Sequence, residues 1–226
     1  MSINIAIDGP AGAGKSTIAK KLSKELSYIY VDTGAMYRAM ALFCIREGAD
    51  IDDGQAVSDL CQKADVKIEY RSGIQRILLN GEDVGDKIRA EEVGNITSKI
   101  SAYQKVREKL TALQQKLARE NDVVMDGRDI GTCVLPNAQV KIYLTASVEA
   151  RAKRRYDELK NKGEQVSLEQ IEADIKERDF RDMHRDVAPL VKAEDAALID
   201  SSDMGISEVV TEILVLLKKK GFVKKA

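Results

Sequence analysis

The chain has 226 residues, 44% of them hydrophobic and 32% charged, and 36 Lys and Arg side chains nearly balance 37 Asp and Glu. This composition is typical of one water-soluble globular domain with insertions, it argues against nucleic acid as a partner, and three scattered cysteines favour neither a disulfide framework nor a zinc site. No apolar run approaches the roughly 18 residues of a membrane span and no signal peptide is recognisable, so we expect a cytoplasmic protein that contacts no membrane.

The first predicted strand, Ile3–Asp8, leads into a glycine-rich loop that matches the pattern G-x-x-x-x-G-K-[ST]. Apolar residues at four-residue spacing over 18–26 predict a helix directly after it. In this context backbone N–H groups cradle a polyphosphate, Lys15 reaches the β- and γ-phosphates, and Ser16 can ligate magnesium. A glycine-rich turn without a ligand is the alternative. The predicted phosphate-binding residues are Gly9, Pro10, Ala11, Gly12, Ala13, Gly14, Lys15, Ser16 and Thr17.

A second strand is predicted over Tyr28–Asp32, and a helix begins at Thr33 and continues past Ile45. If this strand is parallel to the first, Asp32, Thr33 and Arg38 lie beside the phosphate loop, because ligands of such sheets bind beyond the carboxyl ends of the strands. The alternative is a helix cap followed by a solvated arginine.

From Asp50 the alternation of strand and helix breaks. Residues 65–71 and 74–80 alternate polar and apolar side chains around Ser72-Gly73, which predicts a β-hairpin in an inserted antiparallel module. Helical stretches from about 90 to 121 lead back to the core. Two polar residues in these stretches, Ser98 and Arg107, are predicted from periodicity alone to be surface residues.

A third strand over Asp122–Asp126 ends in an acid that suits the support of magnesium, and a charged turn over 127–131 follows. A capping aspartate is the alternative for Asp126. After a fourth strand, Val140–Leu144, a helix carries three arginines at i, i+3 and i+4, without enough nearby acids to neutralise them. We expect these residues, Arg151, Arg154 and Arg155, to share one face, and we expect residues 160–166 to form a mobile tip.

The next helix begins near Ser167 and places Arg178, Asp182 and Arg185 at i, i+4 and i+7 on one face. This stripe either contacts a ligand or forms a solvated ladder of ion pairs, which would add little stability. A fifth strand over Ala196–Asp200 and a last helix with an apolar face complete the chain. Five strands, each followed by a helix, predict an α/β fold with a five-stranded parallel sheet flanked by helices and an inserted hairpin.

A phosphate loop in such a fold fits a kinase for a small acceptor, a GTPase-like switch or an ATPase module of a larger assembly. The switch is disfavoured because a guanine-reading N-K-x-D segment is missing. The ATPase module is disfavoured because the many arginines exceed what one triphosphate needs and indicate a second phosphorylated substrate. A kinase for another small phosphorylated acceptor stays open at this point.

Taken together, four segments closely resemble bacterial cytidylate kinase, and the resemblance spans nearly the whole chain. These segments are Gly9–Ser16, Asp32–Arg38, Asp126–Thr132 and Arg178–Arg185. The resemblance implies a P-loop nucleoside monophosphate kinase that transfers the γ-phosphoryl group of ATP to CMP or dCMP with Mg²⁺. It also implies one domain, expected to be monomeric, with a core (about 1–62 and 100–226), a monophosphate-binding insert (about 63–99) and a lid (about 151–167).

The resemblance implies three groups of contacts with CMP. Thr33, Arg38 and Arg128 would hold its phosphate, and Thr33 stands where we associate serine with this family. Ser98, Arg107 and Asp129 would read the cytosine. Arg178 and Asp182 would meet the sugar. The full set of residues implied to bind CMP is Asp32, Thr33, Arg38, Ser98, Arg107, Arg128, Asp129, Arg178, Asp182 and Arg185.

For the donor side, the resemblance implies a lid that closes over ATP, with Arg151 among the ATP contacts. Magnesium would be held by Ser16, and Asp126 would support this arrangement without binding the metal directly. The residues implied to act in phosphoryl transfer are Lys15, Arg128, Arg154, Arg155 and Arg185.

Overall fold

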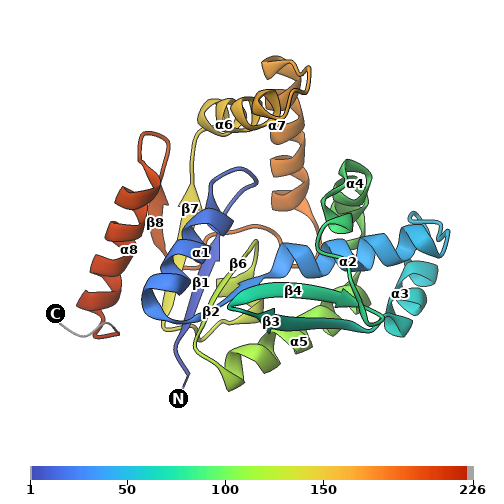
Figure 1. Ribbon diagram of the computed structural model, residues 1–226, viewed down its shortest axis with the longest axis horizontal. Coiled ribbons are helices and arrows are strands. Elements are labelled where there is room, and N and C mark those ends of the chain that lie inside the picture. The colour runs from blue at the N-terminus through green and yellow to red at the C-terminus, as the bar shows by residue number, and fades with distance from the viewer. Residues whose placement is uncertain (1, 223–226) are drawn as a thin grey trace.

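The computed structural model describes residues 2–222, and its centre is a sheet of five parallel strands (Figure 1). The strands are β1 Asn4–Asp8, β2 Ile29–Asp32, β6 Val123–Gly127, β7 Val140–Thr145 and β8 Ala197–Asp200. Their order is β2-β6-β1-β7-β8, and each neighbouring pair is parallel, which confirms the predicted sheet. Because β1 is central, the loop that follows it lies at the carboxyl edge, between the ends of β6 and β7.

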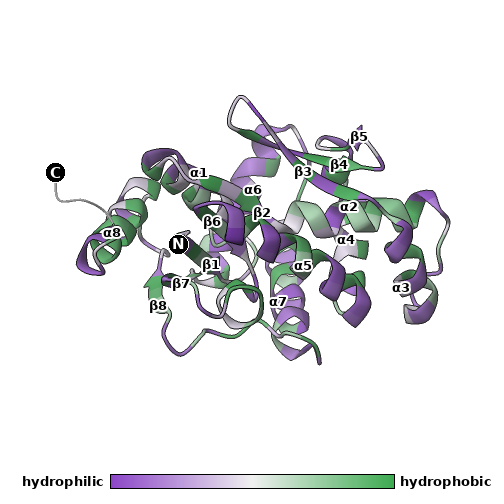
Figure 2. Ribbon diagram, turned by 90° about the horizontal axis from the view of Figure 1, so that it is seen from below, coloured by the Kyte–Doolittle hydropathy of each residue, from purple (hydrophilic) through white to green (hydrophobic). Residues whose placement is uncertain are grey.

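Helices cover both faces of this sheet. Ile5 and Ile7 of β1 pack in one apolar cluster with α1 (Lys15–Leu26) and α8 (Ile206–Lys219). Ala6, which points the opposite way, packs in another cluster with Ala118 of α5 (Gln104–Glu120). A strand buried on both faces has no polar alternation, which is why 5–7 is uniformly apolar. Helices α5 and α8 carry both hydrophobic and hydrophilic residues along their length, as helices packed on one side do (Figure 2).

Between β2 and β6 the chain forms an inserted module that contains a three-stranded antiparallel sheet in the order β3-β4-β5. Its other elements, besides α5, are α2 Thr33–Arg46, α3 Gly54–Lys63, β3 Val66–Arg71, β4 Ile74–Leu79, β5 Glu82–Asp83, η1 Lys87–Arg89 and α4 Glu91–Ile100. Ser72 and Gly73 both have positive φ, 53° and 74°, so the predicted hairpin is closed by the kind of two-residue turn that favours glycine at its second position. Strand β5 was not predicted, because two residues carry no alternation pattern.

The module is built around α2, whose residues Met36 and Met40 are fully buried in a third apolar cluster. Ile77 of β4 and Leu110 of α5 belong to the same cluster. The hairpin therefore has no core of its own and packs on the helix that follows β2.

After β7 the chain forms a helical hairpin of α6 (Val148–Asn161) and α7 (Leu168–His184), which projects from the carboxyl end of the sheet (Figure 1). Its apolar contact joins Ala152 and Leu159 to Ile171 and Ile175. The predicted break is confirmed: α6 ends before Gly163, and Ser167 caps α7 by accepting a hydrogen bond from the Gln170 amide. No helix within 2–222 has both the length and the apolar character that a membrane crossing requires.

Candidate active site

The loop between β1 and α1 has a conformation that requires glycine. Gly9 has φ of 147°, and a Cβ atom there would lie 1.9 Å from the Leu144 carbonyl oxygen of β7. Gly14, with φ of 89°, precedes α1 and places no side chain over the helix N-terminus. The first-turn N–H groups are therefore open to an anion. Gly12, Ser16 and Thr17 are exposed, Pro10, Ala13 and Lys15 are buried, and Ala11 and Gly14 are intermediate.

Lys15 is only 6% exposed, and its Nζ donates a 2.7 Å hydrogen bond to the carbonyl oxygen of Pro10 in its own loop. Burial lowers the pKa of Lys15 well below its ordinary value, Arg128 and Arg178 lower it further, and Asp126 opposes them. A phosphate group beside this amine would favour its charged form, because an opposite charge raises the pKa of a cation.

Ser16 and Asp126 form the part of the site that fits magnesium. Ser16 Oγ donates a 2.8 Å hydrogen bond to Asp126 Oδ2, while Asp126 Oδ1 is buried without a hydrogen-bond partner. Burial raises the pKa of Asp126 to about 6, and the charge of Asp32 adds to this increase. Hydroxyl and carboxylate oxygens are ligands that suit Mg²⁺, and the described residues include no group of three or more His, Cys, Asp or Glu that could hold a metal ion. A metal here would therefore need most of its oxygens from phosphate and water.

Asp8, at the end of β1, fixes the charged turn beside this loop. Its two carboxylate oxygens accept hydrogen bonds of 2.8 and 2.7 Å from the amides of Ile130 and Gly131. Burial raises the pKa of Asp8 to about 6, although these two hydrogen bonds lower it. The two amides begin η2 (Ile130–Val134), a π-helical turn that was not predicted. The sequence shows an acid before the glycine loop but not its partners, which lie 122 and 123 positions later.

At the start of α2 the parallel pairing of β2 and β6 brings Thr33 beside Asp126. Thr33 Oγ1 donates a 2.7 Å hydrogen bond to the Asp126 carbonyl oxygen. Asp32 caps α2 by accepting from the Ala35 amide, so the capping interpretation holds for this residue. Arg38 is not a solvated arginine. It donates to the Ile88 carbonyl oxygen, and burial lowers its pKa, partly against the charge of Asp32.

Asp129 lies between two arginines from distant segments. It forms ion pairs with Arg107 of α5 and, at 3.5 Å, with Arg185. Arg107 also donates to the Ser101 carbonyl oxygen, and its guanidinium lies 5.6 Å from the Tyr37 ring centroid. The prediction that Arg107 is a surface residue was wrong: it is 6% exposed, because these partners compensate its buried charge.

Ser98 lies on α4, one turn before Ser101, and is partly buried. Tyr37 was missed by the sequence reasoning. The guanidinium of Arg107 lies over its ring, and its hydroxyl is buried without a hydrogen-bond partner. The periodic pattern of α2 offered no signal for it, because a tyrosine on an apolar face is indistinguishable from a core residue.

Arg128 and two residues of α7 form a second ionic group. Arg128 Nε donates a 2.8 Å hydrogen bond to Asp182 Oδ2, and Asp182 is buried. Burial and the charge of Arg128 lower the pKa of Arg178 to about 10, and the Nε of Arg178 is buried without a partner. A solvated ladder was therefore the wrong interpretation. Arg185 lies just past the end of α7 in extended conformation, so the predicted i+7 helical position of this residue was wrong too.

The three arginines of α6 do not share one uncompensated face, which corrects the prediction. Arg151 is buried, forms an ion pair with Asp179 of α7 and donates to the Ala11 carbonyl oxygen of the phosphate loop. Arg154 donates to the Ser201 carbonyl oxygen after β8. Arg155 forms an ion pair with Glu158 on its own helix. Long guanidinium side chains reached different partners, which the helical spacing of their Cα atoms does not determine. Sequence reasoning had missed Asp179.

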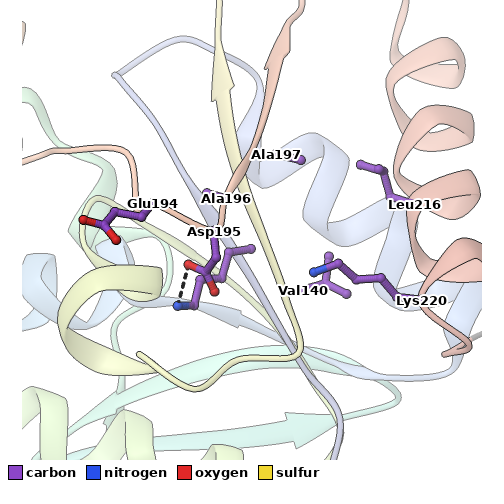
Figure 3. A pocket seen from close by; sticks show the side chains of 8 residues that line it. Val140, Glu194, Asp195, Ala196, Ala197, Leu216 and Lys220 are labelled. Carbon is purple, nitrogen blue, oxygen red and sulfur yellow. Dashed lines mark hydrogen bonds and ion pairs between the residues drawn. The ribbon is translucent and has the colours of Figure 1, made fainter.

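An open pocket lies away from all these residues, where β7 and β8 begin (Figure 3). The ion pair between Lys141 and Asp195 crosses it, and Lys220 of the segment after α8 lines it. Its volume of about 220 Å³ is below the roughly 300–1,000 Å³ of ligand pockets. None of the residues that line it is a predicted site residue.

Comparisons with known proteins give one consistent result. A family model described as Cytidylate kinase matches residues 5–219. The Cytidylate kinase of Caldicellulosiruptor saccharolyticus is 51% identical over 217 residues, which cover 96% of each chain. The Cytidylate kinase of Shouchella clausii is 48% identical over 216 residues, again 96% of each. A solved structure of an uncharacterized protein from Eubacterium ventriosum superposes with a TM-score of 0.52 at 14% identity, covering 97% of this chain and 99% of that one, which shows a shared fold only.

Proposed function

This chain belongs to the cytidylate kinase family, and we propose that it transfers the γ-phosphoryl group of ATP to CMP or dCMP, giving ADP and CDP or dCDP. The ATP triphosphate binds the loop between β1 and α1. The acceptor nucleotide binds between α2, α5, the turn after β6 and the end of α7.

The observation that carries the proposal is the gathering of buried and partly buried cations at the carboxyl edge of the sheet. Burial lowers the pKa of each of four of them, Lys15, Arg38, Arg178 and Arg185, and neighbouring cations lower it further. Lys15 belongs to the donor loop, whereas the arginines come from α2 and the end of α7. Such repulsion is relieved when anions bind, and cations on two sides of the loop suit two phosphorylated substrates.

The acceptor phosphate is held by Thr33, Arg38 and Arg128. Arg178 and Asp182 bind the sugar, and Arg185 lies close to these two residues. The α2 N-terminus adds positive potential at the phosphate. These groups surround the end of β6, so the acceptor phosphate comes within reach of the donor loop.

The base is read by the pair of Asp129 and Arg107, with Ser98 nearby. Cytosine offers an amino donor beside a ring acceptor, and a carboxylate beside a guanidinium offers the complementary acceptor and donor. Uracil presents the reverse order at these positions, and a purine is larger. A wrong base would leave the buried Asp129 and Arg107 groups without hydrogen-bond partners, and the cost of doing so makes the site specific for cytosine.

Phosphoryl transfer needs alignment and charge neutralisation rather than a nucleophilic side chain, because the acceptor phosphate itself attacks. Lys15, Arg128 and Arg185 stabilise the charge that develops on the transferred group. Magnesium, held with Ser16 and supported by Asp126, supplies further charge neutralisation on the donor phosphates when bound.

Residues 151–167, which include most of α6 and the loop before α7, act as the lid in this proposal. Arg151 links it to the phosphate loop through Ala11, and Arg154 and Arg155 turn toward ATP when the lid closes and excludes water. We further propose a cytoplasmic monomer. Among residues 2–222, the exposed large hydrophobic side chains lie on several elements, namely β4, β8, α7, α8 and the loop after α7.

The test is an ADP-release assay on the purified protein with ATP, magnesium and each common nucleoside monophosphate. We expect turnover with CMP and dCMP, little with UMP, and none with AMP or GMP. ATP hydrolysis at the same rate without any acceptor would support the ATPase module instead. Turnover with a different phosphorylated acceptor would keep the kinase and remove the cytidine assignment.

A further inference from the structure

Strand β2 is one of the two edge strands of the core sheet and pairs only with β6 among the described strands. The Ile29 amide donates a 2.9 Å hydrogen bond to Asp122 on the β6 side. Because backbone groups alternate in direction along a strand, those of Tyr30 and Asp32 point to the outer edge. Unpaired groups at a strand edge need partners, and a polar side chain can supply them.

Two side chains of the β3–β4 hairpin supply partners at this edge. Tyr70 Oη donates a 3.0 Å hydrogen bond to the Tyr30 carbonyl oxygen. Gln75 Oε1 accepts at 2.9 Å from the Asp32 amide, and Gln75 Nε2 lies 3.5 Å from the Asp32 carbonyl oxygen. Tyr70 and Gln75 are directly opposite each other in the hairpin register, and the hairpin lies beside β2 (Figure 1). The pair thus replaces the backbone of a missing neighbouring strand.

The Asp32 peptide is also the start of the acceptor site. The Asp32 side chain caps α2 through the Ala35 amide, and the next residue, Thr33, bonds the carbonyl oxygen of Asp126. A shift of this peptide would therefore move the cap, the Thr33 hydroxyl and the N-terminus of α2 together.

We propose that Gln75 is a positioning residue for the acceptor nucleotide: it holds the Asp32–Thr33 turn in the place where Thr33 and α2 meet the acceptor phosphate, with Tyr70 as its support. This inference rests on the proposed function. The hairpin does not need Gln75 to stay docked, because Ile77 and Leu79 of β4 are buried in the cluster around α2. Loss of the Gln75 amide thus frees the Asp32 peptide without removing the apolar contacts of the module.

The variant Gln75→Met keeps the length of the side chain and removes both hydrogen-bonding groups. We expect the KM for CMP to rise about five- to tenfold, because the loss of this hydrogen bond leaves Thr33 and the α2 N-terminus less well ordered for the acceptor phosphate. The KM for ATP should stay within about twofold of the wild-type value. Arg76→Met is the matched control, because Arg76 is the next residue of β4 and points to the opposite face, and its side chain is 45% exposed and forms, among the described residues, only a 3.6 Å ion pair with Asp83. An unchanged KM for CMP, or equal rises for CMP and ATP, would overturn the proposal.

A second readout is independent of activity. Hydrogen exchange of the Asp32 amide, followed by NMR in the nucleotide-free protein, should become faster in Gln75→Met and stay unchanged in Arg76→Met. If Gln75→Met fails to fold, Tyr70→Phe decides with the same two readouts, since it removes one hydroxyl and no apolar surface. If the wild-type protein does not phosphorylate CMP, the proposed function fails, whereas the exchange of the Asp32 amide still shows whether Gln75 fixes this turn. Identical exchange of the Asp32 amide in Gln75→Met and in the wild type would show that Gln75 does not fix this turn.

Discussion

Replacing Asp129 by asparagine removes the charge that pairs with Arg107 and Arg185. The side chains of all three residues are less than 10% exposed. Removing one member of a buried ion pair leaves the partner charge uncompensated, which destabilises a protein by roughly 3–5 kcal/mol. Because Arg107 keeps its hydrogen bond to Ser101 and its contact with the Tyr37 ring, we expect the lower value, about 3 kcal/mol. At roughly 2–4 °C per kcal/mol for a chain of this size, Tm should fall by about 6–12 °C.

Calorimetry of the nucleotide-free protein measures this Tm change, and the ADP-release assay measures base selection. The KM for CMP should rise at least about tenfold, and the preference for CMP over UMP should shrink, because an amide can donate to uracil where the carboxylate only accepts. Asp186→Asn is the control, since Asp186 is exposed and follows Arg185 directly. A Tm within about 2 °C of wild type together with an unchanged KM for CMP would show that the buried pair neither supports the fold nor reads the base.

Three further outcomes follow from the site. Lys15→Met should lower kcat by at least about a thousandfold in a folded protein, because a cation at the transferring phosphates is lost; a tenth of the activity would contradict this. The pKa of Asp126 is raised to about 6 in the fold, so the contribution of its protonated form to stability is fully present below about pH 4 and is lost as pH rises through about 6. The free energy of unfolding of Asp126→Asn, measured in denaturant without metal, should therefore depend less on pH between about 4 and 6 than that of the wild type. The same pH dependence in both proteins would refute the pKa shift. Arg155→Ala should reduce kcat about tenfold with less effect on the Kd for CMP, and hydrogen exchange over 151–166 should slow on adding a bisubstrate analogue; no change in either measurement would remove the lid role.

Several features of the fold were predictable because they depend on neighbouring residues. The glycine loop, the five strands and the Ser72-Gly73 turn follow from positive φ, side-chain size and the periods of helix and strand. The parallel sheet then followed from the alternation of strands and helices, and it brings the ends of β1, β2 and β6 to one edge. The short β5 strand and the π-helical turn after β6 escaped prediction, because neither repeats a pattern long enough to recognise.

The sequence by itself determined that this edge of the sheet suits phosphorylated nucleotides. The phosphate loop and the segments that carry the family resemblance are short residue patterns, which can be recognised without the fold. Only the tertiary structure decided the partners of the charged side chains. Arg107 has the spacing of a surface residue but is buried against Asp129, and the three arginines of α6 each have different partners. The sequence indicates only that Gln75 is a hairpin residue, and the fold places its side chain against the Asp32 amide at the edge of β2. The reason is that a long polar side chain selects its partner from whatever the strand register and helix packing bring within about 3 Å, and those distances depend on residues far away along the chain.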